Sequence, residues 1–181
     1  AIRDEQTGMQ PQISSAEYDW VKMGTDIDGD RGADRTGHVV SLDSTGYILT
    51  VSSMYADVYE DGVQVADLGD AGRVRRYQYY GNDWHQMGSD IVGEHTSNKV
   101  GNTMSSSADG STVIYGTRYD NTNGTSTGKA EVYTFADTPI VSTLDYIIKG
   151  NPFYGEMLMN TSGTSSSGTK LGASVSINYN G

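Results

Sequence analysis

The stretch WVKMGTDIDGDRGADRTGHVVSLDSTG, residues 20–46, decides the reading of this chain because it returns further along. Its opening, WVKMGTDIDGD, reappears as WHQMGSDIVGE at residues 84–94 and more weakly as YIIKGNPFYGE at residues 146–156. The matched glycines Gly24, Gly88 and Gly150 lie 64 and 62 residues apart (88 − 24 and 150 − 88). A chain that repeats itself at this period is predicted to consist of similar supersecondary units rather than of one irregular core.

The rest of the unit repeats as well, and its pattern is that of short strands. GHVVSLDSTG from Gly37 is matched by GNTMSSSADG from Gly101 and by GASVSINYNG from Gly172, and GRVRRYQYY from Gly72 by GKAEVYTF from Gly128. Apolar and polar residues alternate in these segments, and turn signals such as DSTG and GND separate them. No segment has a helical period. We therefore predict an all-β fold of tandem four-stranded antiparallel units that resemble β-propeller blades.

The repeat also divides the chain. We expect a partial unit over 1–36 with terminal strands including one at Trp20, a first full repeat over 37–100 and a second over 101–156. Residues 157–181 are predicted to hold a Ser- and Gly-rich insertion followed by the first strand of a third repeat.

Composition restricts the partners. The 181 residues include 23 acidic and 12 basic side chains, for a net charge of −11, and no cysteine. Such a surface repels phosphate groups, so nucleic acids and anionic membranes are disfavoured as partners. No apolar run is long enough for membrane insertion. The acidity, together with a first residue that is not methionine, favours a secreted or cell-surface protein.

The repeated motif W-x-x-x-G-[ST]-D-I-x-G-[DE], followed by G-x-x-x-S, by D-G or T-G and by G-x-[VA]-x-x-Y, resembles a known type of repeat. It is similar to tandem β-repeats of secreted and surface proteins of marine microbes and algae, which look related to the integrin-type β-propeller repeat. The resemblance covers the chain from about Gly8 to Gly181. It implies blade-like sheets and an extracellular location, and says almost nothing about activity.

Four aspartates of the first copy form the candidate metal site: Asp26, Asp28, Asp30 and Asp34. Their alternating spacing is that of the first ligands of a calcium loop, but the closing bidentate acid is missing. The repeat supplies an internal control, because among these positions only the acid at Asp30 persists, as Glu94 and Glu156. The sequence therefore favours a structural turn, with calcium possible as the only cofactor.

Two further features have a functional and a structural interpretation. Trp20, Trp84 and Tyr146 are either sugar-stacking platforms or, as we favour, largely buried anchors that hold each unit against its neighbour. The basic run 73–76, RVRR, either docks an acidic surface of another copy or protects an edge strand.

Two other motifs are weak. The stretch GTSTG around Ser126 has the spacing of a nucleophile elbow but lacks the predicted strand–helix context. Asn123 and Asn160 lie in glycosylation sequons, of which chance supplies about this many in so Ser- and Thr-rich a chain.

These features favour a non-enzymatic extracellular structural protein that assembles with itself, through terminal or edge strands, into a fibre, layer or larger propeller array. The expected partner is another copy, giving a homo-oligomer or polymer. The alternative is a glycan- or calcium-dependent adhesion module, and a hydrolase is a third possibility.

Overall fold

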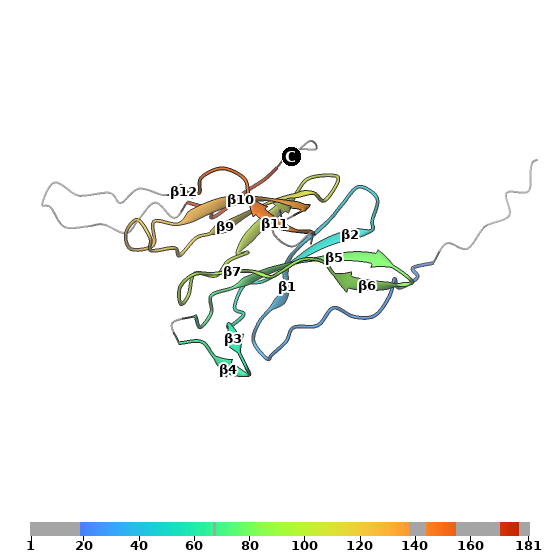
Figure 1. The fold of residues 1–181 in the computed structure, drawn as a ribbon, viewed down its shortest axis with the longest axis horizontal. Helices are drawn as coiled ribbons and strands as arrows, with labels where there is room; N and C mark the ends of the chain where they lie inside the picture. Colours follow the sequence, from blue (N-terminus) through green and yellow to red (C-terminus); the bar gives the residue numbers. More distant parts are fainter. Residues whose placement is uncertain (1–18, 67, 138–143, 155–170, 178–181) are drawn as a thin grey trace, which may run out of the picture.

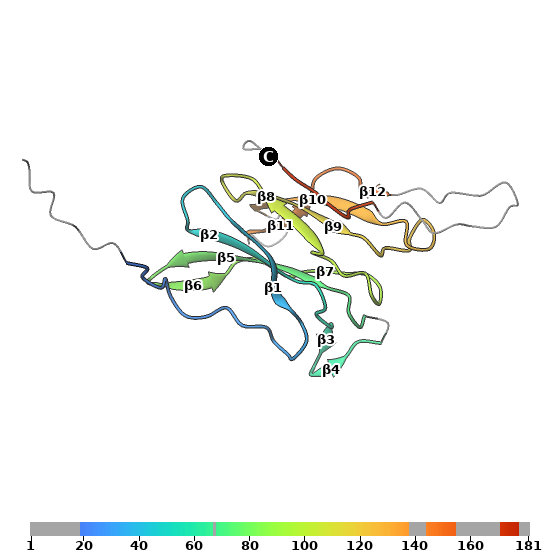
Figure 2. The ribbon, with the colours of Figure 1, turned by 180° about the vertical axis from the view of Figure 1, so that it is seen from behind.

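The computed structural model describes residues 19–66, 68–137, 144–154 and 171–177. All regular secondary structure in these ranges is strand, and every sheet is antiparallel, so the predicted all-β class is confirmed. Figures 1 and 2 show two layers of strands, with the second sheet in yellow and orange lying over the first in cyan and green. No helix long and apolar enough to cross a membrane occurs in the described part of the chain.

The first sheet has the order β1-β2-β5-β6, with the short β7 also paired to β5. Its strands are β1 (Thr36–Leu42), β2 (Ile48–Ser53), β5 (Arg73–Tyr80), β6 (Asp83–Gln86) and β7 (Ile91–Val92). The loop from β2 to β5 carries a two-stranded hairpin that projects away from the second sheet (Figure 1). This hairpin consists of β3 (Tyr59–Glu60) and β4 (Val63–Gln64).

The second sheet has the order β11-β10-β9-β8, with β12 also paired to β10, so its strands are connected as in the first. Its strands are β8 (Thr103–Ser106), β9 (Thr112–Thr117), β10 (Lys129–Asp137), β11 (Leu144–Ile148) and β12 (Phe153–Tyr154). The register corresponds too. Trp84 faces Tyr79 across β6 and β5, and Tyr146 faces Phe135 across β11 and β10. These are the residue pairs that the repeat in the sequence aligns.

The two sheets share one apolar core. Side chains alternate between the faces of a strand, so Val74 on β5 points to one face while Arg73 and Arg75 point to the other. Val74 packs with Val100, which lies between the two sheets in the chain, and with side chains of the second sheet. Val39 contacts the same cluster from β1. The buried cluster is Val74, Ile91, Val100, Met104, Val113 and Tyr115. Most of its apolar area comes from facing sheets, so neither sheet can bury its core residues alone.

The turn between the first two strands of each sheet is held by one polar side chain. In the first sheet the carboxylate of Asp43 accepts hydrogen bonds from the N–H groups of Tyr47 and Ile48, both at 2.9 Å. In the second sheet the hydroxyl of Ser107 accepts the N–H of Thr112 at 3.0 Å. A short side-chain acceptor at this position closes a tight turn, because it satisfies backbone donors that have no ladder partner.

Two predictions need correction. Residues 19–35 form no strand, so the strand expected at Trp20 is absent; this segment contacts β6 through side chains and has no neighbouring strand to pair with in the described ranges. The RVRR strand is not an edge, because β5 lies between β2 on one side and β6 and β7 on the other. The described residues form no closed barrel or propeller, and two units with parts of a third are too few to close one.

The predicted aromatic anchors are less buried than we expected. Trp20 is 99% exposed. Trp84 is half-buried: its ring packs edge-on against Tyr79, with centroids 5.2 Å apart, and its indole N–H donates to the carbonyl of Met23 at 2.9 Å. Trp84 therefore holds the preceding segment to the sheet through Met23, although its side chain is only half-buried.

Candidate functional site

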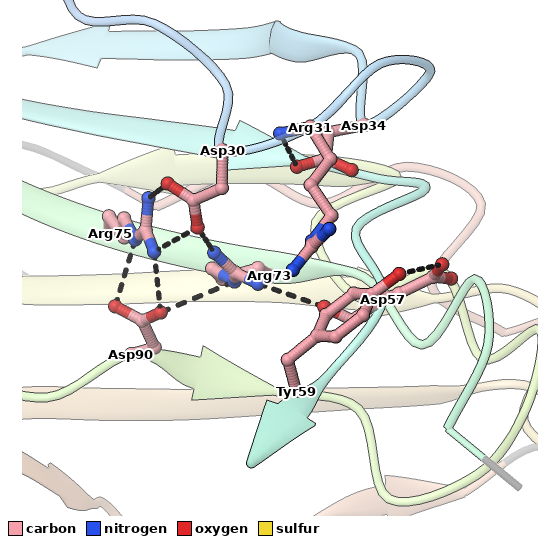
Figure 3. A pocket seen from close by; sticks show the side chains of 8 residues that line it. All are labelled: Asp30, Arg31, Asp34, Asp57, Tyr59, Arg73, Arg75 and Asp90. Carbon is pink, nitrogen blue, oxygen red and sulfur yellow. Dashed lines mark hydrogen bonds and ion pairs between the residues drawn. The ribbon is translucent and has the colours of Figure 1, made fainter. Parts of the chain in front are cut away.

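A cavity of about 450 Å³ opens beside the first sheet, on the face turned away from the second sheet (Figure 3). Three parts of the chain build it: the segment before β1, the loop that carries β3 and β4, and strand β5 with the turn before β7. Its walls are charged on almost every side. The lining residues are Asp30, Arg31, Asp34, Asp57, Tyr59, Arg73, Arg75 and Asp90.

Asp30 lies between the two arginines of β5. Its carboxylate accepts hydrogen bonds from Arg75 at 2.8 and 2.6 Å and pairs with Arg73 through Oδ2. Asp90 binds Arg75 from the other side, at 2.9 and 3.0 Å. The dashed lines in Figure 3 show the resulting chain of alternating charges. Planar guanidinium groups suit such paired contacts with carboxylates.

This arrangement stabilises the ionised form of Asp30. The hydrogen bonds from Arg75, helped by those from Arg73 and opposed by partial burial, lower the pKa of Asp30 from 3.8 to about 2. The same contacts raise the pKa of Arg75 above its ordinary value. Both guanidiniums therefore already hold carboxylates of their own chain, so the proposed docking of RVRR on another copy would require these ion pairs to open.

The second sheet repeats this contact. Lys129 stands first in β10 as Arg73 stands first in β5, and its ammonium lies 3.2 Å from Glu94, the repeat counterpart of Asp30. Lys129 also pairs with Glu131 at 3.0 Å, and Glu131 accepts the hydroxyl of Tyr115 at 2.7 Å. In both places the acid that follows the repeated glycine binds the cation that opens the third strand of the next sheet. This role explains why that acid alone persists in the repeat.

The four candidate metal ligands do not all converge, because only Asp30 and Asp34 line the cavity. Asp26 pairs with Lys22 at 2.8 Å, Asp28 is exposed, and Asp30 is held by the arginines of β5. Among the described residues no group of three or more His, Cys, Asp or Glu side chains has a geometry that could hold a metal ion.

Asp34 has a structural role that its repeat counterpart shares. Its carboxylate accepts the backbone N–H of Arg31 at 3.2 Å, and the side chain of Asn98 accepts the N–H of His95 at 2.8 Å. Both Asp34 and Asn98 are buried. In each copy a side-chain oxygen accepts the backbone N–H of the residue three positions earlier and so closes the turn. Asp and Asn both supply such an oxygen. Two of the four regularly spaced aspartates therefore have structural roles: Asp30 forms ion pairs with β5, and Asp34 closes a turn.

A second arrangement, remote from the cavity, joins successive units through their first strands. The hydroxyl of Ser41 in β1 accepts the backbone N–H of Ser106 in β8 at 3.3 Å. The hydroxyl of Ser105 accepts the N–H of Ile177 at 3.4 Å. Ser41 aligns with Ser105, and Ser106 with Ile177, in the repeat. We call this contact the serine joint.

The linkers that lead into these first strands correspond as well. Val100 forms a parallel bridge with Gly72, and Leu171 forms one with Gly128. The N–H of Val100 donates to Ala71 and that of Leu171 to Thr127, both at 2.9 Å. Both glycines have positive φ, 81° and 79°, and a Cβ on either would lie within 2.3 Å of a backbone atom of its bridge partner. Residues 171–177 thus approach the second sheet as residues 100–106 approach the first.

The remaining motifs have plain positions. Ser126 lies in the loop before β10, where its N–H donates to Asn121 at 2.7 Å, and a strand follows it instead of the helix that a nucleophile elbow requires. Asn123 is exposed in the same loop, and Asn160 lies outside the described residues.

Neither a scan against protein-family models nor a search of the curated proteins gave a match.

Sequence reasoning missed the cavity and the serine joint. The aligned Ser41 and Ser105 were visible in the repeat and could have suggested a shared contact. The loop that carries β3 and β4 could also have drawn attention, because residues 54–72 are longer than their counterpart 118–128. The extra length of this loop supplies Asp57 and Tyr59 to the cavity, and the shorter loop of the second sheet has no equivalent residues.

Proposed function

We propose that this chain is a non-enzymatic structural protein of the extracellular space or cell surface, built from tandem four-stranded units of propeller-blade type. Its units stack face to face, and the chain assembles with further copies of itself. The observation that carries the proposal is the serine joint, which occurs once between the two sheets and again between the second sheet and residues 171–177.

A contact that recurs at the same repeat positions supports a stacking rule that does not depend on how many units are present. Stacked repeats bury a continuous core between neighbours and leave the outermost faces uncovered. The first sheet has such a face, with Val40 and Leu42 on β1 exposed by 59% and 55%. An uncovered apolar face favours association.

Sedimentation velocity over a range of concentrations tests this function. The weight-average sedimentation coefficient should rise with protein concentration. Electron microscopy of the concentrated sample should show rows of subunits of similar size. A chain that stays monomeric at the highest soluble concentration would rule the proposal out.

A binding module is the second candidate, supported by the cavity. Its walls present carboxylates, guanidiniums and the ring of Tyr59, over which the Arg31 guanidinium lies 3.7 Å from the ring centroid. Hydroxyl-rich ligands bind to such mixtures of acceptors, donors and an aromatic face. The ligand class is therefore a glycan.

A glycan array followed by calorimetric titration tests the second candidate. Tyr59→Ala should abolish binding of any oligosaccharide that the array identifies. The control Tyr80→Ala, at a residue that is 54% exposed and outside the cavity, should leave it unchanged. Titration with and without calcium, in a chelator-treated sample, separates a metal-dependent module from a metal-independent one.

A further inference from the structure

The face of the first sheet that is turned away from the second sheet is only partly covered. Residues 19–35 lie over it at β5 and β6, where Asp30 binds Arg73 and Met23 binds Trp84. In Figure 1 this blue segment passes below the first sheet, opposite the second. Along β1 and at the Leu49 end of β2 the face remains open and is apolar. Its residues, here called the open face, are Val40, Leu42 and Leu49.

The second sheet shows what normally covers this face. Val40 aligns with Met104, and both point to the same side of their first strand. Met104 is only 7% exposed because the first sheet packs on it, whereas Val40 is 59% exposed. Likewise, the N–H of Ser106 is bound by Ser41, and Leu42 is the residue of the first sheet that aligns with Ser106.

Residues 171–177 present the complementary surface. Alternation along this segment places Val175 and Ile177 toward β8, where both are half-buried, and Ser174 and Ser176 on the opposite side, where both are exposed. Ser176 aligns with Ser41 and Ser105, the two acceptors of the serine joint. The hydroxyl that continues the series is therefore present on the surface of the chain.

We infer that residues 171–177 of one copy, still bound to their own second sheet, stack on the open face of the next copy. The hydroxyl of Ser176 accepts the backbone N–H of Leu42 of that copy, and Val40 and Leu42 become buried. The two surfaces differ, so the contact is head-to-tail and propagates from copy to copy. This inference rests on the proposed self-assembly and names the surfaces that perform it.

Two substitutions in the full-length chain test it, one on each surface. Leu42→Asp places a charge on the open face, and Ser176→Asp places one on the complementary surface; either charge would be buried without a partner in the contact. Each variant alone should show an association constant lowered at least about tenfold. Val63→Asp is the matched control, because Val63 is a 70% exposed apolar residue of β4 that belongs to neither surface, and it should associate like the unmodified chain. Circular dichroism melts should show that all three variants fold.

Mixing the two variants gives the decisive measurement. Leu42→Asp retains the surface at 171–177, and Ser176→Asp retains the open face, so the mixture should form heterodimers that stop at two subunits. If the unmodified chain associates but neither variant weakens it, or if the mixture remains monomeric, the stacking contact is overturned while self-assembly itself stands. If the unmodified chain is monomeric, the proposed function falls and this contact with it.

Discussion

At the scale of single residues, the recurrent acid after the repeated glycine is best understood as a bridge between successive units. Asp30 reaches Arg73 and Arg75 in the sheet that follows it, and Glu94 reaches Lys129 in the next sheet. The basic residues that open the third strands are therefore matched by acids far away in the sequence. Three of the four Lys and Arg side chains in the described strands pair with one of these two acids.

The lowered pKa of Asp30 predicts how stability depends on pH. The folded-state pKa of about 2 lies below the unfolded value of 3.8, so the carboxylate stabilises the fold above pH 4 and loses this effect as the pH falls toward 2. Because the Asp30 side chain is 45% exposed, solvent screening reduces the contribution to roughly 1 kcal/mol.

Asp30→Asn should therefore lower the free energy of unfolding at pH 7 by roughly 1 kcal/mol, with a smaller difference from the unmodified chain at pH 2. Urea unfolding at a series of pH values measures both. The control is Asp26→Asn, which removes a carboxylate whose ion pair with Lys22 is exposed on both sides. A constant difference between Asp30→Asn and the unmodified chain from pH 7 to pH 2 would contradict the ion-pair role.

Lys129 predicts a larger effect because it is buried. Its side chain is 4% exposed, and that of Glu131, its partner at 3.0 Å, is 5% exposed. Lys129→Met leaves the Glu131 carboxylate buried without its cation, which should cost about 3–5 kcal/mol in unfolding free energy. The double variant Lys129→Met/Glu131→Gln keeps an acceptor for Tyr115 without the charge and should recover most of this loss. If the double variant is no more stable than the single one, the ion pair is not the cause.

At the scale of elements, the strands that find a partner were predictable from local sequence, whereas which strands pair with which was not. The period-2 alternation and the turn residues around Asp43 locate β1 and β2, because both depend on neighbouring residues in the chain. The segment at Trp20 has the same local pattern as β6 yet forms no strand, since a strand also needs a paired neighbour. For the same reason RVRR could not be recognised as a central strand from its charges.

The candidate site was equally divided between predictable and unpredictable parts. The persistence of an acid at Asp30 and Glu94 showed that this position matters, but its partner lies 43 residues away at Arg73, a separation that no local pattern encodes. The cavity depends on the long loop at Tyr59, which has no counterpart in the second repeat.

The loop that carries β3 and β4 is predicted to be dispensable for the sheet. Replacing residues 54–72 by the shorter equivalent 118–128 should retain the fold, because β2 and β5 pair along their whole length without help from the hairpin. The graft removes Asp57 and Tyr59, so it should also remove any glycan binding. Far-UV circular dichroism and sedimentation of the graft check the first point. Loss of the folded signal would show that the hairpin stabilises the first sheet.

At the scale of the whole molecule, the shared core predicts that the two sheets unfold together. Val74 of the first sheet packs in one cluster with Val113 and Tyr115 of the second. Separating the sheets would therefore expose apolar side chains of both. The two tryptophans of the chain, Trp20 and Trp84, lie before and within the first sheet, so their fluorescence reports on that half alone.

Tyr115→Ala in the second sheet should therefore lower the melting temperature reported by the tryptophans of the first half. The Tyr115 side chain is 1% exposed and donates to Glu131, so its removal should cost about 3–5 kcal/mol, as other large buried aromatic side chains do. If unfolding is a single cooperative step, the tryptophan and far-UV circular dichroism melts of the variant fall by the same number of degrees and remain superimposable. The control Tyr80→Ala, at an exposed ring stacked on His85, should move neither melt by more than a small amount. A tryptophan melt that keeps its original midpoint while the circular dichroism melt falls would show two independent sheets. In that case the serine joint would connect units without coupling their stability, and a stack of copies would lengthen without becoming more stable.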